Sequence, residues 1–305
     1  MEYMLETNIT SSSVFTLEKL IDAYKKSTIL FAKALVYDKG KGLKFNLGGY
    51  EAFMPCQEVY LSFDENNIKE AAVVTRVNKF VCFVITAVKQ NGAEYFFEIS
   101  RKKAQQIAYD NYISKLKCGD IIPCGITHID KFGAFCDIAC GISALLPIDF
   151  ISVSRIQSPS DRFCEGQNIF ACIKTCGCDG RIVLSHKELL GTWLENASYF
   201  KAGTSTTGIV RSIESYGIFI ELTPNLAGLA ELCDGVNVGD AVNVYIKNIL
   251  PDKMKIKLVI ISTIKEDTFL PEIKYFKTNG NIKHWRYSTE NCNKLIETFF
   301  NPDIL

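Results

Sequence analysis

The chain has 305 residues, enough for two or three domains of ordinary size. Its 34 lysines and arginines equal its 34 aspartates and glutamates, so it has no overall basic field of the kind that attracts duplex nucleic acid. The amino terminus is acidic and polar rather than basic and then apolar, and no apolar run is long enough to span a membrane as a helix. We therefore expect a cytoplasmic protein with no membrane partner.

Residues 1–27 are predicted to form an N-terminal helical arm. Apolar residues recur there at helical spacing, at Leu17, Leu20, Ile21 and Tyr24. Ser13 or Thr16 precedes them in the position of an N-cap. We expect this helix to pack on the domain that follows rather than to bind a separate partner.

Residues 28–103, the first repeat, have the strand-like runs of a small, divergent barrel. These runs lie at 31–37, 42–47 and 80–85. The repeat ends in Ile99-Ser100-Arg101, which aligns with Leu184-Ser185-His186 further along the chain. Residues 102–117 then predict a linker helix with a local net charge of +3, and residues 187–200 predict a similar helix after the second repeat.

A short aromatic pattern occurs twice, as Phe132-Gly133-Ala134-Phe135 and as Tyr216-Gly217-Ile218-Phe219. A glycine inside a strand marks a bulge or a close approach of another backbone. A bulge beside Gly133 would bring both aromatic rings to one side of the strand, as a stacking surface for nucleobases. The alternative places both rings in the core, and a single copy would favour it. The repetition favours the stacking surface.

The two copies belong to longer repeats in register. They are 84 residues apart, and Gly119-Asp120 aligns with Gly203-Thr204 at the same offset. Several short strands with turn signals follow each copy, so residues 116–186 and 203–263, the second and third repeats, predict small closed barrels. The local net charges are −2 over residues 118–186 and −1 over residues 203–263, so phosphate attraction must come from local geometry.

The repeated pattern resembles the RNA-binding repeat of the ribosomal protein S-one family, a five-stranded OB-fold barrel. The segment from Arg181 to Leu189 is very similar to the strand-to-linker junction of that family. The resemblance implies a mainly β fold of three tandem five-stranded OB-fold barrels joined by short helices. An N-terminal helix and a small C-terminal α/β tail complete the expected fold.

The resemblance also implies a set of RNA-binding residues, in which aromatic rings stack on bases and cations meet phosphates. These residues are Lys131, Phe132, Phe135, Arg181, Arg211, Tyr216, Phe219, Lys255 and Lys257. Two positions depart from the family, since Pro147 and Glu231 stand where the family often has a histidine. His128 is interpreted as structural. The first repeat lacks the aromatic pattern and has Phe96 where the second has Arg181, so we expect it to dock to the small ribosomal subunit, as leading repeats of the family do.

Residues 264–305 leave the repeat. Ser288-Thr289-Glu290 resembles a helix cap, and Cys292, Leu295, Ile296 and Phe299 follow at helical spacing, so a C-terminal helix packed on the third repeat is predicted. An alternative gives residues 284–287 an exposed base-stacking role.

The chain has 12 cysteines, eight of them from Cys118 to Cys178, but their spacing differs from that of zinc knuckles. We expect no metal, no cofactor and no enzymatic activity.

Three hypotheses for the function follow. In the first, the chain binds single-stranded mRNA and acts in translation. In the second, the same barrels form an accessory RNA-binding factor in transcription or RNA decay, because such repeats are also appended to polynucleotide phosphorylase. In the third, the barrels are a non-enzymatic protein–protein interaction module, which the neutral charge permits.

Overall fold

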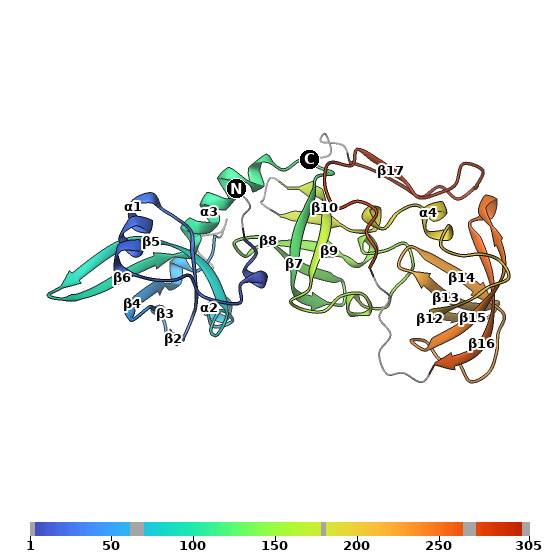
Figure 1. The fold of residues 1–305 in the computed structure, drawn as a ribbon, viewed down its shortest axis with the longest axis horizontal. Coiled ribbons are helices and arrows are strands. Elements are labelled where there is room, and N and C mark those ends of the chain that lie inside the picture. Colours follow the sequence, from blue (N-terminus) through green and yellow to red (C-terminus); the bar gives the residue numbers. More distant parts are fainter. Residues whose placement is uncertain (1–3, 62–69, 178–180, 265–272, 301–305) are drawn as a thin grey trace.

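The computed structural model describes residues 4–61, 70–177, 181–264 and 273–300. The three repeats lie in a row, with the first at the left, the second in the middle and the third at the right (Figure 1). The C-terminal segment runs back over the second and third repeats. Among the described residues, no helix has the length and apolar character needed to cross a membrane.

The second repeat is a closed five-stranded barrel. Its strands are β7 (Ile121–Asp130), β8 (Gly133–Ala139), β9 (Ile142–Pro147), β10 (Asn168–Cys176) and β11 (Ile182–Ser185). Around the barrel the order is β7-β8-β9-β11-β10, and only β9 and β11 pair in parallel. This is the arrangement of an OB-fold. Because side chains alternate along a strand, β7 turns Ile122, Cys124 and Ile126 into the core.

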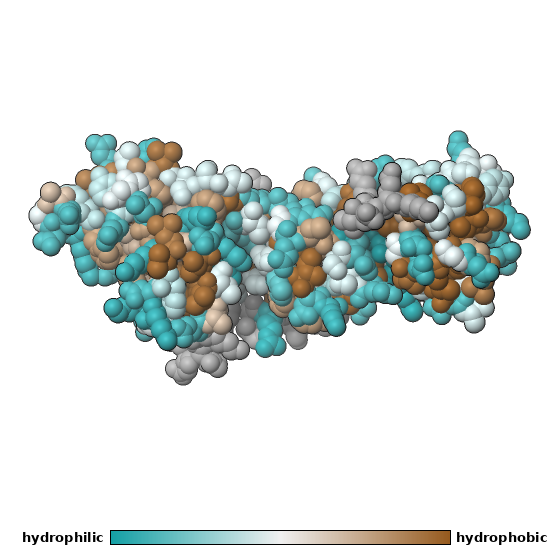
Figure 2. Space-filling model, turned by 90° about the horizontal axis from the view of Figure 1, so that it is seen from below, coloured by the Kyte–Doolittle hydropathy of each residue, from teal (hydrophilic) through white to brown (hydrophobic). Residues whose placement is uncertain are grey.

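The third repeat is a second closed barrel with the same order of strands. Its strands are β12 (Ser205–Glu214), β13 (Gly217–Thr223), β14 (Leu226–Ala230), β15 (Ala241–Leu250) and β16 (Lys255–Ile264). Again one pair, β14 with β16, is parallel. Seen from below, apolar residues gather on the surface at the third-repeat end of the molecule (Figure 2). Val259 and Ile261 of β16 are among the exposed apolar residues of this repeat.

The first repeat is an open six-stranded sheet instead of the closed five-stranded barrel that the sequence predicts. Its strands are β1 (Leu30–Lys33), β2 (Val36–Asp38), β3 (Gly42–Leu47), β4 (Tyr50–Pro55), β5 (Phe80–Asn91) and β6 (Glu94–Ser100). The order β1-β5-β6-β4-β3-β2 places two consecutive strands at opposite ends of the sheet. Between them, the Ala34 N–H donates to the Lys79 carbonyl and the Leu35 N–H to the Lys44 carbonyl. The first strand of an OB-type barrel is therefore present, but interrupted at these two residues.

Short helices connect the sheets. The α-helices are α1 (Leu17–Lys26), α2 (Glu70–Val74), α3 (Arg101–Asn111) and α4 (Trp193–Ala197). The 3-10 helices are η1 (Glu6–Asn8), η2 (Cys56–Glu58), η3 (Ile113–Lys115), η4 (Ile148–Phe150), η5 (Pro159–Asp161), η6 (Lys187–Leu190) and η7 (Pro251–Lys253). Of the two N-caps proposed for α1, Thr16 is the one used, since its side chain accepts from the Lys19 N–H. Leu20 of α1 lies in the core of the first repeat, as expected.

The C-terminal segment contains a β-hairpin where the sequence predicts a helix. The hairpin pairs β17 (His284–Arg286) with β18 (Glu297–Phe299). Ser288, the predicted helix cap, has a different role. Its hydroxyl accepts from the Ile296 N–H at 2.7 Å and donates to the Lys294 carbonyl at 2.6 Å, which closes the hairpin loop. The helical spacing was misleading because these long-range bonds fix the segment as strands.

The same segment contacts both closed barrels. The Ile121 N–H of the second repeat donates to the Gly280 carbonyl, and the Tyr287 hydroxyl donates to the Asn225 carbonyl of the third. Trp285 and Tyr287 are buried in the core of the third repeat. They are therefore not available to stack on bases, which corrects the alternative for these two residues, whereas His284 and Arg286 are exposed.

A buried ion cluster joins the second and third repeats. Arg162 of the second repeat donates to both carboxylate oxygens of Glu221 in the third, at 2.5 and 2.8 Å. Both of these side chains are fully buried. Arg211 donates to the same carboxylate, and Asn225 accepts from the Val153 N–H and donates to the Lys187 carbonyl. The two barrels are thus fixed relative to each other by paired buried groups.

A second buried cluster joins the N-terminal segment to the first two repeats. Arg101 at the start of α3 donates to both carboxylate oxygens of Glu6, each at 2.7 Å. The Glu6 N–H donates to Asp137 of the second repeat at 2.6 Å. Burial beside the Glu6 carboxylate raises the pKa of Asp137 to about 7, while the Arg101 guanidinium holds the pKa of Glu6 below its usual value despite the burial of that carboxyl.

Candidate nucleic-acid interface

A close backbone approach places each aromatic pattern. Gly133 at the start of β8 lies opposite Pro147 of β9, and a Cβ at Gly133 would be 2.6 Å from the Leu146 carbonyl oxygen. Gly217 at the start of β13 is equivalent, since a Cβ there would be 2.5 Å from the Ala230 carbonyl oxygen. A side chain larger than hydrogen does not fit at either place. Of the two explanations for these glycines, the close approach is confirmed.

The bulge that the sequence suggests beside Gly133 is not there: the irregular pairing of β7 with β8 lies on β7. The register between β7 and β8 shifts between Ile126 and His128 on β7. Phe132 lies in the turn before β8, outside the strict alternation of the strand. It therefore reaches the face of Phe135 without a bulge at the glycine.

The second and third repeats each bring their two aromatic rings into contact. We name Phe132 with Phe135, and Tyr216 with Phe219, the stacking pairs. Their ring centroids are 5.9 Å and 6.0 Å apart, and both pairs are perpendicular, at 90°. Phe132 is 52% exposed and Tyr216 is 68% exposed. The outer ring of each pair is therefore a surface group, and the alternative that both rings of a pair belong to the core is excluded.

His128 extends the stacking pair of the second repeat. Its ring lies nearly parallel to Phe135, at 17° and 6.3 Å between centroids, and it bonds Glu165 at 2.9 Å. The sequence interpretation gave His128 a structural role, but the side chain is exposed on the stacking surface. Only the register, which places His128 directly opposite Phe135, reveals this position.

The predicted cations have different surroundings. Lys131 is exposed in the turn beside Phe132, and Arg181 is exposed immediately before β11. The neighbouring residues Asp179 and Gly180 lie outside the described part of the chain. Arg211 is held by Glu221 at 2.9 Å through Nε, and its side chain is only 11% exposed.

The two lysines of β16 share the outer face, as the alternation predicts, because Ile256 between them is buried. Lys257 lies in one cross-strand row with Leu229 and Phe219. Two strand spacings separate Lys257 from Phe219, about 10 Å. Lys255 lines a pocket together with Tyr216 and Phe219.

This pocket, which we name the junction pocket, has a volume of about 440 Å³. Four predicted residues line it: Arg211, Tyr216, Phe219 and Lys255. Part of its wall comes from outside the third repeat, from residues 153–155 of the second repeat, from Trp193 of α4 and from Tyr287, Lys294 and Ile296 of the C-terminal segment. Lys257 is not part of it.

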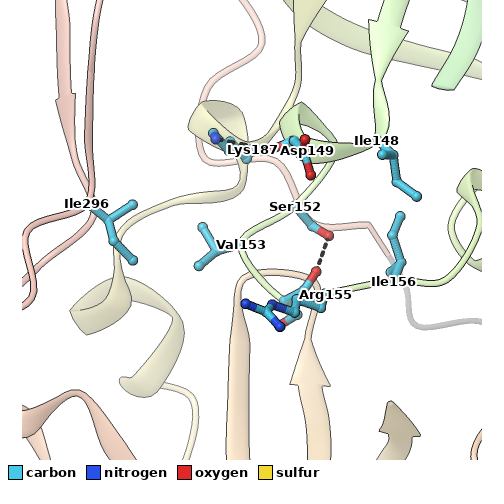
Figure 3. A pocket seen from close by; sticks show the side chains of 9 residues that line it. Ile148, Asp149, Ser152, Val153, Arg155, Ile156, Lys187 and Ile296 are labelled. Atoms are coloured by element: carbon cyan, nitrogen blue, oxygen red, sulfur yellow. Dashed lines mark hydrogen bonds between the residues drawn. The ribbon is translucent and has the colours of Figure 1, made fainter. Parts of the chain in front are cut away.

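An adjoining pocket of about 460 Å³ extends from the same loop toward the second repeat. Ile296 of the hairpin faces Val153 of the loop there, and Arg155 lies below them (Figure 3). Val153, Ser154, Arg155 and Ile296 line both pockets. The hollowed surface therefore continues from the third repeat onto the second.

The first repeat has lysines where the other two have stacking pairs. Gly42 lies opposite Pro55 as Gly133 lies opposite Pro147, so Lys41 and Lys44 are equivalent to Phe132 and Phe135. Both ammonium groups pair with Asp38, at 4.0 and 3.4 Å. The same register confirms that Phe96 stands where the second repeat has Arg181.

The cysteines show no metal site within the part of the chain that the structure describes, because no three potential metal ligands come together there. Cys178 lies outside that part. Cys124, Cys136 and Cys172 are buried in barrel cores. A hydrogen bond with the Cys136 thiol and burial raise the pKa of Cys124 well above the usual thiol value, and burial beside the Glu188 carboxylate does the same to the pKa of Cys172.

Comparison with protein families gives one match, the S1 RNA binding domain, over residues 115–187. The second repeat is therefore similar to the S1 RNA binding domain. The match confirms the resemblance to the S-one family, and the same order of strands in the third repeat extends the architecture beyond the matched residues.

Similar proteins include small ribosomal subunit proteins. The bS1 protein of Leuconostoc lactis is 27% identical over 234 residues, which cover 71% of this chain and 52% of that protein. A bS1 homolog of Bacillus cereus is 26% identical, with 87% of this chain and 67% of that protein covered. The chain thus spans about half to two thirds of the length of these relatives.

Two further matches have other descriptions. A 4-hydroxy-3-methylbut-2-enyl diphosphate reductase of Fusobacterium nucleatum is 29% identical, with 80% of this chain but only 30% of that protein covered. Among solved structures, a multidomain protein with nucleic acid binding domains from Streptococcus pneumoniae matches 77% of this chain and 74% of that chain, at 10% identity and a TM-score of 0.25.

Sequence reasoning missed three cations of the junction pocket, two of which come from outside the third repeat. Arg155, Lys253 and Lys294 line the junction pocket, and none of them belongs to the predicted set. Lys253 had a local signal, since it lies two residues before Lys255. Arg155 and Lys294 had none, because only the packing of the loop and the hairpin on the third repeat brings them to Tyr216.

Proposed function

We propose that the chain binds single-stranded RNA through its second and third repeats, as a non-enzymatic mRNA-binding protein of translation. The observation that carries this proposal is that the second and third repeats hold equivalent stacking pairs, each with one ring largely exposed. An exposed aromatic ring on an OB-fold barrel offers a base a flat surface. The S1 match to the second repeat and the similarity to bS1 proteins support the choice of RNA as ligand.

Each residue has a simple part in this binding. Phe132 and Tyr216 stack on bases, and the half-buried Phe135 and Phe219 hold them perpendicular. Lys131, Arg181, Lys255 and Lys257 contact phosphates, which adds affinity without sequence information. Arg211 adds positive charge to the lining of the junction pocket, where Glu221 holds its guanidinium in place.

The first repeat has a different role in this proposal. Lys41 and Lys44 replace the stacking pair and are paired with Asp38, so this surface offers no ring to a base. We propose that the first repeat docks to the small ribosomal subunit in the cytoplasm. An accessory role in transcription or RNA decay would use the same RNA-binding barrels without that docking, and co-sedimentation of the full chain with ribosomal subunits separates the two. Recovery of the chain only in the unbound fraction would contradict the docking role.

The decisive experiment titrates a fluorescent single-stranded RNA with the full chain and with Phe132→Ala/Tyr216→Ala. Stacking contributes about 1–3 kcal/mol per base, so the double variant should lose at least about tenfold in affinity. Tyr24→Ala is the matched control, because Tyr24 is an aromatic residue of α1 that is 41% exposed. Equal affinity of the double variant and the control would refute stacking. No binding by the unmodified chain at low salt, where electrostatic attraction is strongest, would refute RNA binding itself.

A further inference from the structure

The cations that line the junction pocket come mostly from outside the predicted set. Besides Arg211, which pairs with Glu221, four cations line it: Lys253 and Lys255 belong to the third repeat, Arg155 to the second, and Lys294 to the C-terminal hairpin. All four side chains are exposed, and within the described residues none of them forms an ion pair. Among the described residues, Glu214 supplies the one carboxylate of the lining. A repeat with a net charge of −1 thus faces a pocket with an excess of positive charge.

The floor of the pocket is apolar and aromatic. Phe219, Trp193 and Met254 line it, and the buried Tyr287 forms one side. Tyr216 stands at its edge, 68% exposed. An apolar floor beneath an exposed ring and a rim of cations matches the two parts of a nucleotide, a flat base and a phosphodiester. The volume of about 440 Å³ lies in the range of ordinary ligand pockets.

Fixed contacts hold the outside walls in place. The Val153 N–H donates to Asn225 at 3.0 Å, and the Ser154 N–H donates to the Pro224 carbonyl at 3.2 Å. These bonds place Arg155 against the turn between β13 and β14. The Ser288 hydroxyl fixes the hairpin loop by accepting from Ile296 and donating to the Lys294 carbonyl. Both walls are therefore formed before any ligand arrives, which reduces the entropic cost of binding.

We propose that the junction pocket is a composite nucleotide-binding site that the third repeat alone does not possess. In it, Tyr216 stacks on one base of a single-stranded RNA, while Arg155 and Lys294 contact the phosphates on either side of that nucleotide. Arg155 also lines the adjoining pocket toward the second repeat, so the strand passes from the third repeat to the second along this loop. This inference rests on the proposed function and assigns two contacts that the barrel itself does not supply.

The test measures the affinity of the full chain for a fluorescein-labelled oligouridylate over a range of salt concentrations. Arg155→Ala and Lys294→Ala should each weaken binding several-fold and lower the slope of log K against log salt by about 0.7, the value for one phosphate contact on a single strand. Lys25→Ala is the matched control, since Lys25 is an exposed lysine of α1 far from the pocket. It should leave both the affinity and the slope unchanged.

The outcomes separate this inference from the proposed function. Binding that is weakened by Tyr216→Ala but unaffected by Arg155→Ala and Lys294→Ala would retain the stacking pair as a site and overturn the composite pocket. Loss of affinity with an unchanged salt slope would also overturn it, because the two side chains would then not contact phosphates. If the unmodified chain does not bind the oligonucleotide at all, both proposals fail together.

Discussion

The buried cluster between the second and third repeats makes a quantitative prediction about stability. The Glu221 carboxylate is fully buried and accepts four hydrogen bonds, two from Arg162 and two from Arg211. Glu221→Gln keeps the shape of the side chain but removes its charge. The Arg162 guanidinium is then left in the interior without a counterion. Removal of one partner of a buried ion pair costs about 3–5 kcal/mol, a large part of the stability of a typical domain.

Urea unfolding measures this loss directly. The chain has two tryptophans, Trp193 and Trp285, and both are buried in the core cluster of the third repeat, so their fluorescence reports on this barrel. With a denaturant slope of about 1–3 kcal/mol per molar urea, Glu221→Gln should lower the midpoint by more than about 1 M. Glu214→Gln, an exposed carboxylate of the same barrel, should change the stability by less than about 0.5 kcal/mol.

A companion variant tests the physical reason. Replacement of the whole cluster by apolar side chains removes the charges together and leaves none unpaired, and such replacements are often neutral or stabilising. Arg162→Met/Arg211→Met/Glu221→Leu should therefore recover most of the stability that Glu221→Gln loses. A midpoint for Glu221→Gln equal to that of Glu214→Gln would refute the reasoning, because the buried carboxylate would then contribute no more than an exposed one.

Two further predictions concern buried titratable groups. Burial lowers the pKa of His186 to about 4, so the unfolded chain takes up a proton from about pH 6.5 downward while the folded chain does not. Folding should lose about 3 kcal/mol at this site between pH 6.5 and pH 4, and urea unfolding of His186→Gln should lack this part of the pH dependence; identical profiles would contradict it. Cys124 and Cys172 are buried, and their raised pKa keeps both thiols protonated. Iodoacetamide at pH 8 should therefore modify the exposed Cys164 and Cys233 first. Mass spectrometry of the digested chain checks the order, and early labelling of Cys124 would refute it.

The parts of the fold that could be predicted rest on local and repeated signals. The offset of 84 residues places Phe132 and Tyr216 at equivalent positions, and both barrels follow from the short strands around them. The helical spacing from Leu17 onward predicts α1 together with its cap. The interruption of the first strand at Ala34 and Leu35 has no such signal, because the apolar run continues through both residues.

The parts that could not be predicted depend on contacts between distant segments. Spacing alone favours a helix from Cys292 to Phe299, but the bonds of Ser288 and the pairing with β17 make the segment a hairpin. Arg211 resembles an exposed cation in the sequence, whereas Glu221 on the neighbouring strand holds it mostly buried. Where a charged side chain points is decided by its partners, which a single sequence does not display.

Neutral overall charge is compatible with the proposed RNA binding because the relevant charge is local. Screening limits attraction between exposed charges to roughly 10 Å at ordinary salt, so the four unpaired cations of the junction pocket act on a bound strand while distant acidic residues do not. The Arg162–Glu221 contact then has a second consequence, because it keeps Arg155 beside Tyr216. A chain cut between the second and third repeats would lose both the buried pair and one wall of the pocket. The two barrels are therefore a single binding surface in this proposal, rather than independent domains joined by a linker.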